Sequence, residues 1–419
     1  MNARLRWSGS TAALVGTTLM LSLVYMSLTS WSVAVNELAD SFALSPGAIQ
    51  VGSAALIAGY AIGGFFQGKW IPRFGWRRVF LVVITAFLIA SALIPVVPSY
   101  PVILLLRFVQ GWGCMVVLMC AILSAWFPVK KRGLAIGILL GAIGLGSALG
   151  GYITGILNPI MGWQNTFWVI TAITVVGAVA FLLIVDDAPP LEEEAATAAD
   201  TAGAGGRSVY ADPRLWLLGA ATFCCFFNCY GMYAYLAQYL YSVGFTSAAV
   251  GTVVLVNGLI AVVSTPFGGW FSDRLVPRLG PLRARTFTNA WVAMFVGAVG
   301  CVLIPHLAPL GFGLALLTAA IAGWGIPATN GPGLSLPSDL LGSKAAGPAV
   351  GLVILIAGSG GIIAPAWVPM LAASHGWTLG WYITAAAAVI GLVINLILGT
   401  RGGSNMADVA AGERARSNV

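Results

Sequence analysis

The chain has 419 residues, of which 59% are hydrophobic and only 8% are charged. A soluble domain typically carries roughly 25% charged residues, so this chain cannot cover a water-facing surface and must expose apolar surface to lipid. The composition excludes a soluble enzyme, and the net charge of +7 has a topological explanation that makes nucleic-acid binding unnecessary.

Apolar stretches long enough to cross a bilayer follow one another along the chain. Because a spanning helix needs about 20 apolar residues, the sequence predicts about twelve membrane-spanning helices. The expected ranges are 12–34, 48–71, 77–97, 100–126, 131–157, 163–185, 214–241, 246–271, 284–306, 308–335, 344–371 and 376–399.

Basic residues gather in alternate loops. They cluster at 69–78, 130–132 and 274–285, whereas the intervening loops hold almost none and the first of those carries Glu37 and Asp40. Positive charge is retained on the cytoplasmic side. The sequence therefore predicts a multi-pass protein of the bacterial cytoplasmic (inner) membrane, with both termini in the cytoplasm.

Residues 186–213 differ from the rest of the chain, because an acidic run leads into a segment rich in Ala, Thr and Gly. This composition is typical of a flexible cytoplasmic linker. It separates an N-terminal six-helix bundle, 1–185, from a C-terminal six-helix bundle, 214–400, which a cytoplasmic tail follows, 401–419. The predicted fold class is an all-α membrane protein built of these two bundles.

Glycines of the fifth and eleventh predicted helices match at one constant sequence separation. Such a repeat predicts a pseudo-twofold axis along the membrane normal, with a substrate path between the bundles. Small residues let helices approach closely, so these glycines predict either helices that slide during transport or static packing. The matched residues are Gly133 and Gly347, Gly137 and Gly351, Gly144 and Gly358, Gly146 and Gly360, and, at a second separation, Gly68 and Gly269, and Arg73 and Arg274.

The stretch Gly269-Trp-Phe-Ser-Asp-Arg-Leu-Val-Pro-Arg-Leu-Gly280 resembles the cytoplasmic loop motif of the major facilitator superfamily, and the resemblance extends over nearly the whole chain. It implies that Asp273 and nearby basic residues latch the cytoplasmic side closed in the outward-facing state; a solvated loop charge is the alternative. The counterpart beginning at Gly68 has Pro72 in place of the aspartate, which implies a weaker latch there. The expected gating residues are Gly68, Arg73, Gly146, Asp273, Arg274 and Gly360.

Two further motifs leave the subfamily open. The run Arg107-Phe-Val-Gln-Gly-Trp-Gly113 resembles a motif common in drug/proton antiporters, although Ser147 replaces the proline of a second antiporter motif. The run Trp126-Phe-Pro-Val-Lys-Lys-Arg-Gly133 resembles organic-anion carriers such as the monocarboxylate and oxalate–formate groups, but the basic residues that those carriers often use in helices eight and eleven are missing.

Arg107 is the ionisable residue that we place well within the membrane. A charge there costs at least about 2.5–3.5 kcal/mol on insertion scales, so Arg107 should face a cavity or a polar partner. A guanidinium binds a carboxylate through two hydrogen bonds, which predicts an anchor for an organic anion. A structural arginine bonded to backbone carbonyls is the alternative. No buried carboxylate is present to bind a cationic drug and to carry its proton.

Polar and aromatic residues of other helices are expected to complete the substrate site. A buried amide is costly without a partner, which favours a place for it in the substrate path, although it can also bond between helices. The expected substrate-binding residues are Arg107, Tyr25, Asn228, Tyr233, Asn257, Trp324 and Asn330.

The predicted function is secondary active transport of a small, monocarboxylate-like organic anion by alternating access, as anion exchange or as proton-linked transport. The alternatives are an efflux pump for hydrophobic compounds and a membrane sensor that transports nothing. We expect no catalytic residue, no cofactor, no metal and no nucleic-acid partner. The expected partners are a small-molecule substrate, protons in one coupling mode, and the lipid bilayer around a monomer.

Overall fold

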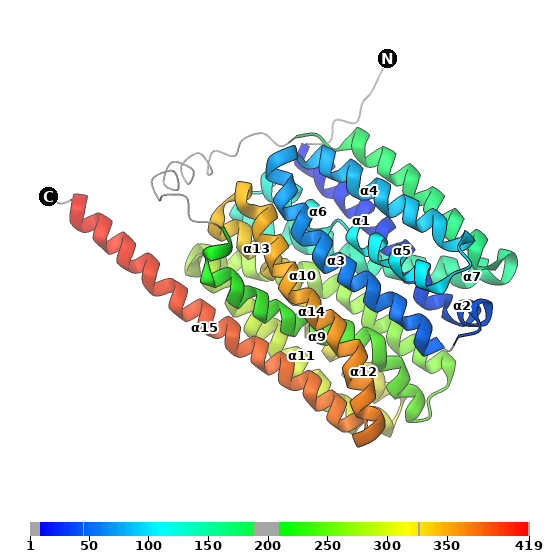
Figure 1. The fold of residues 1–419 in the computed structure, drawn as a ribbon. Coiled ribbons are helices and arrows are strands. Elements are labelled where there is room, and N and C mark those ends of the chain that lie inside the picture. The colour runs from blue at the N-terminus through cyan, green and yellow to red at the C-terminus, as the bar shows by residue number, and fades with distance from the viewer. Residues whose placement is uncertain (1–8, 45, 188–208, 326, 418–419) are drawn as a thin grey trace, which may run out of the picture.

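The computed structural model describes residues 9–44, 46–187, 209–325 and 327–417, and nearly all of these residues are helical (Figure 1). The first half begins with a long helix and ends with one that contains a sharp turn. Its helices are α1 (Gly9–Val33), α2 (Val35–Phe42), α3 (Pro46–Phe74), α4 (Trp76–Leu93), η1 (Ile94–Val96), α5 (Tyr100–Trp112), α6 (Val116–Trp126) and α7 (Val129–Ile184).

The second half has the same plan and ends in a long helix. Its elements are η2 (Val209–Ala211), α9 (Pro213–Ser242), α10 (Ser247–Phe287), the π-helix η3 (Thr288–Phe295), α11 (Val296–Leu307), η4 (Ala308–Leu310), α12 (Phe312–Gly325), η5 (Pro327–Thr329), α13 (Asn330–Leu341), α14 (Ser343–His375) and α15 (Trp377–Ser417).

Ten stretches of the described residues are long and apolar enough to cross a membrane, and two of them, with 56 and 59 residues, are about twice the usual length. Each long stretch folds back on itself at a glycine of positive φ, Gly162 (φ 80°) or Gly280 (φ 77°), a conformation that side-chain-bearing residues seldom adopt. Eight single crossings and two double ones make twelve, which confirms the predicted fold class for the described residues.

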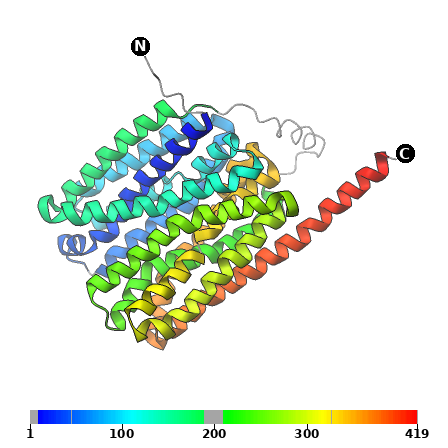
Figure 2. The same cartoon turned by 180° about the vertical axis from the view of Figure 1, so that it is seen from behind.

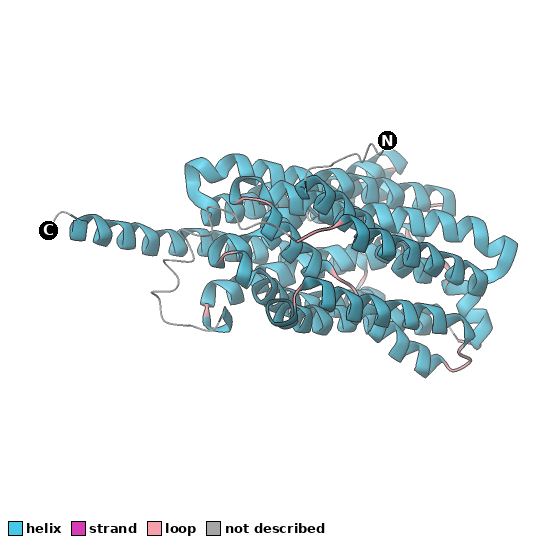
Figure 3. Cartoon of the chain, turned by 90° about the horizontal axis from the view of Figure 1, so that it is seen from above, coloured by secondary structure: helices cyan, strands magenta, loops and turns pink. Residues whose placement is uncertain are grey.

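The helices form two bundles. In Figure 1 the blue and cyan helices α1 to α7 lie together, and the green to red helices α9 to α15 lie beside them. The bundles meet most extensively along two helix pairs, α3 with α14 and α7 with α10, and α6 and α13 add smaller contacts with α14 and α7. The α7–α10 pair runs side by side in the view from behind (Figure 2). The view from above shows helices throughout, with α15 extending beyond the bundles (Figure 3).

Two spans that we predicted as continuous helices are interrupted near their middles, which corrects the ranges 100–126 and 308–335. The first is divided by residues 113–115 into α5 and α6, and the second by η5 into α12 and α13. The sequence separation between these interruptions equals that between Gly133 and Gly347. The repeat therefore includes a broken helix in each bundle.

Two other boundaries also differ from the prediction. The short helix α2 follows α1 at once and was not predicted, and α15 continues to Ser417, where we predicted a helix end near 399 and a tail from 401. The predicted linker falls mostly on 188–208, outside the described residues, so its boundaries stay a prediction.

Candidate functional site

A layer of aromatic side chains lies where the two bundles meet at mid-depth. Tyr25 of α1, Tyr60 of α3 and Phe226 of α9 are buried there. The rings of Tyr60 and Phe226 stack across the bundle boundary, with centroids 6.3 Å apart. Tyr25 is within hydrogen-bonding reach of Cys114 and Tyr230. We call these five residues the central layer.

The interrupted span between α5 and α6 supplies backbone donors to this layer. Cys114 lies in this interruption, just before α6 begins at Val116, and its sulfur is close to the backbone N–H groups of Met115 and Val116. The first N–H groups of a helix lack partners within the helix and carry the positive end of its dipole. The central layer therefore combines phenol hydroxyls with a half-helix N-terminus, and the sequence places no acidic residue at this depth.

Arg107 lies inside the N-terminal bundle, 3% exposed. Its Nη1 donates to Gln110 Oε1 at 2.6 Å, and its Nε donates to the carbonyl of Gly52 at 3.4 Å. Its guanidinium also lies 4.7 Å from the ring centroid of Trp31. These partners belong to α1, α3 and α5, so the structure places Arg107 away from the central layer, and its predicted role as the substrate's anchor stays a prediction.

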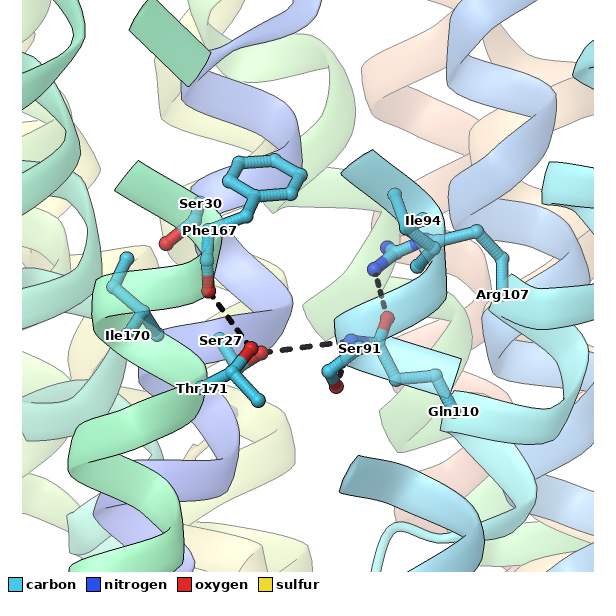
Figure 4. A pocket seen from close by; sticks show the side chains of 9 residues that line it. All are labelled: Ser27, Ser30, Ser91, Ile94, Arg107, Gln110, Phe167, Ile170 and Thr171. Carbon is cyan, nitrogen blue, oxygen red and sulfur yellow. Dashed lines mark hydrogen bonds between the residues drawn. The ribbon is translucent and has the colours of Figure 1, made fainter. Parts of the chain in front are cut away.

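A small cavity of about 10 Å³ opens beside Arg107 (Figure 4). It has room for about one water molecule. Side chains from α1, α4, α5 and α7 line it, and among them Arg107 and Gln110 of α5 lie on the side opposite Thr171 of α7. The complete lining is Ser27, Ser30, Ser91, Ile94, Arg107, Gln110, Phe167, Ile170 and Thr171.

The other predicted substrate residues lie in the C-terminal bundle. Asn257 donates to the carbonyl of Ala319 at 2.8 Å and so joins α10 to α12, which is the alternative that we considered for it. Asn228 is fully buried and bonds to the carbonyl of Cys224 on its own helix. Neither contact involves the central layer, and among the predicted residues whose side chains the structure describes, only Tyr25 belongs to it.

Trp324 packs against Phe267 with the two rings tilted, their centroids 5.1 Å apart. Asn330, at the start of α13, lines a second cavity of about 10 Å³ in the C-terminal bundle. The side chain of Tyr233 lies outside the described residues. The substrate roles of these residues stay predictions.

Asp273 lies in α10 before the Gly280 turn, at an end of the bundles that the basic loops predict to be cytoplasmic, and bridges the two bundles. Its carboxylate accepts from the backbone N–H groups of Gly133, at 3.2 Å, and Leu134, at 2.7 Å, which lie in the second turn of α7. A carboxylate near a helix N-terminus complements the positive end of the helix dipole. These contacts make the predicted alternative, a solvated loop charge, inapplicable, because Asp273 is buried.

The ion-pair partner of Asp273 is Arg285 and not its neighbour Arg274, whose predicted gating role stays a prediction. Arg274 is exposed and lies over the ring of Trp270, 4.2 Å from its centroid. Arg285, at the end of α10 beyond the Gly280 turn, pairs with Asp273 at 2.5 Å. Arg73, the counterpart of Arg274, likewise lies over an aromatic ring, that of Phe74.

Asp339 of α13 extends this pairing to the opposite bundle. Its two oxygens accept from Arg285 Nε at 3.0 Å and from Arg132 Nη1 of α7 at 2.9 Å. All four side chains are at most 8% exposed. We call Arg132, Asp273, Arg285 and Asp339 the cytoplasmic charge cluster. From the sequence, we used its arginines to predict the topology and did not pair them with Asp273 or Asp339. Opposite charges at helix ends that are predicted to be cytoplasmic could have indicated this cluster.

The predicted gating glycines divide into two groups. A Cβ on Gly68 would collide with the backbone of Gly347, so α3 and α14 touch directly between the bundles. A Cβ on Gly146 would meet the carbonyl of Ser22, and one on Gly360 that of Phe223, both within their own bundles. A sliding role for Gly146 and Gly360 stays a prediction.

Two apolar, multi-spanning bundles that meet over a polar central layer and are closed at one end by ionic contacts define a polytopic membrane transporter. The model of the Major Facilitator Superfamily matches residues 17–365, and the chain belongs to that family.

Relatives with described roles include anion transporters and drug exporters. Over 416 residues, 94% of this chain and 95% of the relative, the chain is 25% identical to the probable sulfoacetate transporter SauU of Cupriavidus necator. Over 185 residues, 44% of this chain and 32% of the relative, it is 32% identical to the tetracenomycin C resistance and export protein of Streptomyces glaucescens. The human organic anion transporter MFSD10 has the same fold, with a TM-score of 0.68 at 17% identity, over 92% of this chain and 99% of that one.

Proposed function

We propose that this protein is a secondary transporter of a small organic anion, which binds at the central layer between the bundles. The observation that carries the proposal is the combination of donors there. The hydroxyls of Tyr25 and Tyr230 lie beside Cys114 and the N-terminus of α6, and no acidic residue offsets them. Half-helix N-termini that point at the substrate's anionic group are a recurrent device in transporters.

Alternating access of the two bundles would carry the anion across, coupled to a counter-anion or to a proton. The cytoplasmic charge cluster holds the cytoplasmic ends together in the present conformation. Opening toward the cytoplasm must break its contacts between the bundles. We further propose a monomer in the bacterial inner membrane with both termini cytoplasmic, on the strength of the basic loops. The similarity to a probable sulfoacetate transporter supports an anionic substrate.

The test is binding and uptake of radiolabelled small carboxylates and sulfonates by the purified protein in proteoliposomes. Tyr230→Phe should weaken anion binding about tenfold or more, since a hydrogen bond to a charged group contributes roughly 1.5–3 kcal/mol. Tyr241→Phe is the matched control, because Tyr241 lies on the same helix with 51% of its surface exposed. Anion binding that is equal in both variants would contradict the central site.

Efflux of hydrophobic compounds is the second candidate, and the run from Arg107 to Gly113 together with the similarity to a tetracenomycin exporter favours it. An exporter of this kind would bind uncharged, apolar ligands in preference to small acids. If proteoliposomes accumulate no carboxylate or sulfonate but transport such a ligand, this second function replaces the first.

A further inference from the structure

The cavity beside Arg107 lies inside one bundle and is separate from the central layer. It is bounded by α1, α4, α5, α7 and η1, all of the N-terminal bundle (Figure 4). Its volume of about 10 Å³ holds one water-sized particle and excludes an organic acid of several heavy atoms.

The charge beside this cavity is not balanced by the protein. Within the described part of the chain, Arg107 contacts the amide of Gln110, the carbonyl of Gly52 and the ring of Trp31, all of them neutral. No carboxylate of the described residues forms an ion pair with it. A buried charge without an opposite partner is costly, and this cost favours an anion in the adjoining space.

The remaining lining supplies donors of the right kind. Ser30, Ser91 and Thr171 at present donate to carbonyls one turn back on their own helices, at 2.7–2.8 Å. Those carbonyls also accept the usual backbone N–H of the helix, so each hydroxyl can rotate into the cavity without leaving a buried acceptor unpaired. Gln110 Nε2, which donates to Ser91 at 2.8 Å, presents a further N–H group at the same wall.

The C-terminal bundle contains a cavity of the same volume without a charge. Its polar lining consists of amides, hydroxyls and a thiol. The oxygen Oδ1 of Asn289 has no hydrogen-bond partner there, although Asn289 is 3% exposed. Equal size with different charge makes this second cavity a control for the first.

We propose that the Arg107 cavity binds one small inorganic anion of halide size, held by the guanidinium and the surrounding hydroxyls, at a site distinct from the path of the transported solute. The bound anion neutralises Arg107 and links α1, α4, α5 and α7. This assigns Arg107 a ligand other than the organic substrate.

The experiment is a thermal-stability titration of the purified protein with sodium chloride, in sodium sulfate adjusted to constant ionic strength and without organic acids. Because an anion that binds only the folded protein stabilises it, chloride should raise Tm saturably, whereas sulfate, too large for the cavity, should give only the unsaturable rise of an excluded salt. Arg107→Gln should lose the chloride-dependent shift. Ser91→Ala and Thr171→Val, which keep the guanidinium, should each raise the half-saturating chloride concentration by about tenfold.

Asn289→Ala, at the neutral cavity, is the matched control and should keep the parental chloride response. A saturable shift that persists in Arg107→Gln, or that sulfate reproduces, would overturn the inference. If Arg107→Gln does not fold, Ser91→Ala and Thr171→Val test the proposal. An unchanged half-saturating chloride concentration in both variants would also overturn it. One-for-one displacement of radioactive chloride by an organic acid would show that the cavity belongs to the substrate path. Since chloride is titrated without any organic acid, failure here leaves the proposed transport function untouched.

Discussion

The two sides of the cytoplasmic interface occupy corresponding places in the internal repeat, but different forces hold them. On the α7–α10 side, the buried cytoplasmic charge cluster joins the bundles through ionic hydrogen bonds of 2.5–3.0 Å. On the α3–α14 side, two residues without side chains, Gly68 and Gly347, pack backbone against backbone. Breaking a buried ion pair leaves a charge without its partner and costs about 3–5 kcal/mol, whereas each apolar atom contact contributes only about 0.1–0.2 kcal/mol. The charged side should therefore control opening.

The repeat shows how this asymmetry is encoded. Every member of the cytoplasmic charge cluster corresponds to an uncharged residue in the other half of the repeat. Three of the four are matched by the same sequence separations that relate the glycines. The loop ahead of Arg285 is longer, so that residue is matched by its distance from the turning glycine. The pairs are Asp273 and Pro72, Asp339 and Ala125, Arg132 and Ala346, and Arg285, five residues after Gly280, with Phe80, five residues after Gly75.

The largest expected effect follows from Asp339→Asn. Asp339 serves two arginines at once, and its replacement removes the ion pair with Arg132 and leaves Asp273 as the carboxylate that pairs with Arg285. Breaking a buried ion pair from one side costs about 3–5 kcal/mol, so Tm in detergent should fall markedly. Asp186→Asn is the control, because its pair with Arg77 is exposed and should contribute little. Equal losses in both variants would contradict the comparison.

A smaller and more selective effect is expected for Asp273→Asn. The amide retains one acceptor for the N–H groups of Gly133 and Leu134 but loses the charge that Arg285 requires. Such a bond contributes roughly 1.5–3 kcal/mol, so the transport rate should change about tenfold while the substrate's Kd stays within about twofold. A Kd that rises in proportion to the loss of transport would place Asp273 at the substrate site instead.

On the uncharged side, Gly68→Ala should destabilise the closed form by about 1 kcal/mol, at the low end for overpacking. The added Cβ meets the backbone of Gly347, which cannot move aside without separating α3 from α14. Gly155→Ala is the control, since nothing lies within 4 Å of a Cβ there. Thermal unfolding in detergent should give a lower Tm for Gly68→Ala than for Gly155→Ala. An equal Tm would show that the contact between Gly68 and Gly347 does not stabilise the closed form.

The smallest effect is expected from Pro72→Asp, which restores the acid that the motif lacks. Phe80 occupies the place of the pairing arginine, and it is fully buried. Without a guanidinium to pair with, the new carboxylate should change transport by less than about twofold. A large gain or loss in initial uptake rate would mean that the two sides are more alike than their residues suggest.

Hydropathy and charge position predicted the crossings and the repeat, because both depend on composition averaged over many residues. The interruption at residues 113–115 was not predictable in this way, since the whole run from 100 to 126 is apolar enough to continue as one helix. The partner of Asp273 was also missed, because Arg285 lies beyond the Gly280 turn. Only the folded arrangement brings these two residues together.

For the candidate substrate site, the sequence identified Tyr25 by type and depth, but it did not identify Tyr60, Cys114 or Phe226. Helical periodicity tells which residues share a face of one helix, but not which face meets the other bundle. Arg107 was conspicuous as a buried charge, yet its direction into the N-terminal bundle depends on the packing of α1, α3 and α5.

The most direct test of the charged side's control is a distance measurement across it. Spin labels at Lys131→Cys and Arg278→Cys, in a background with the native cysteines replaced, lie on exposed positions of α7 and α10. Pulsed electron–electron double resonance should give one short distance between the labels in the parental protein. Adding Asp339→Asn should shift the population to longer distances as the cytoplasmic ends separate. An unchanged distance distribution would contradict the claim that the cytoplasmic charge cluster holds this face closed.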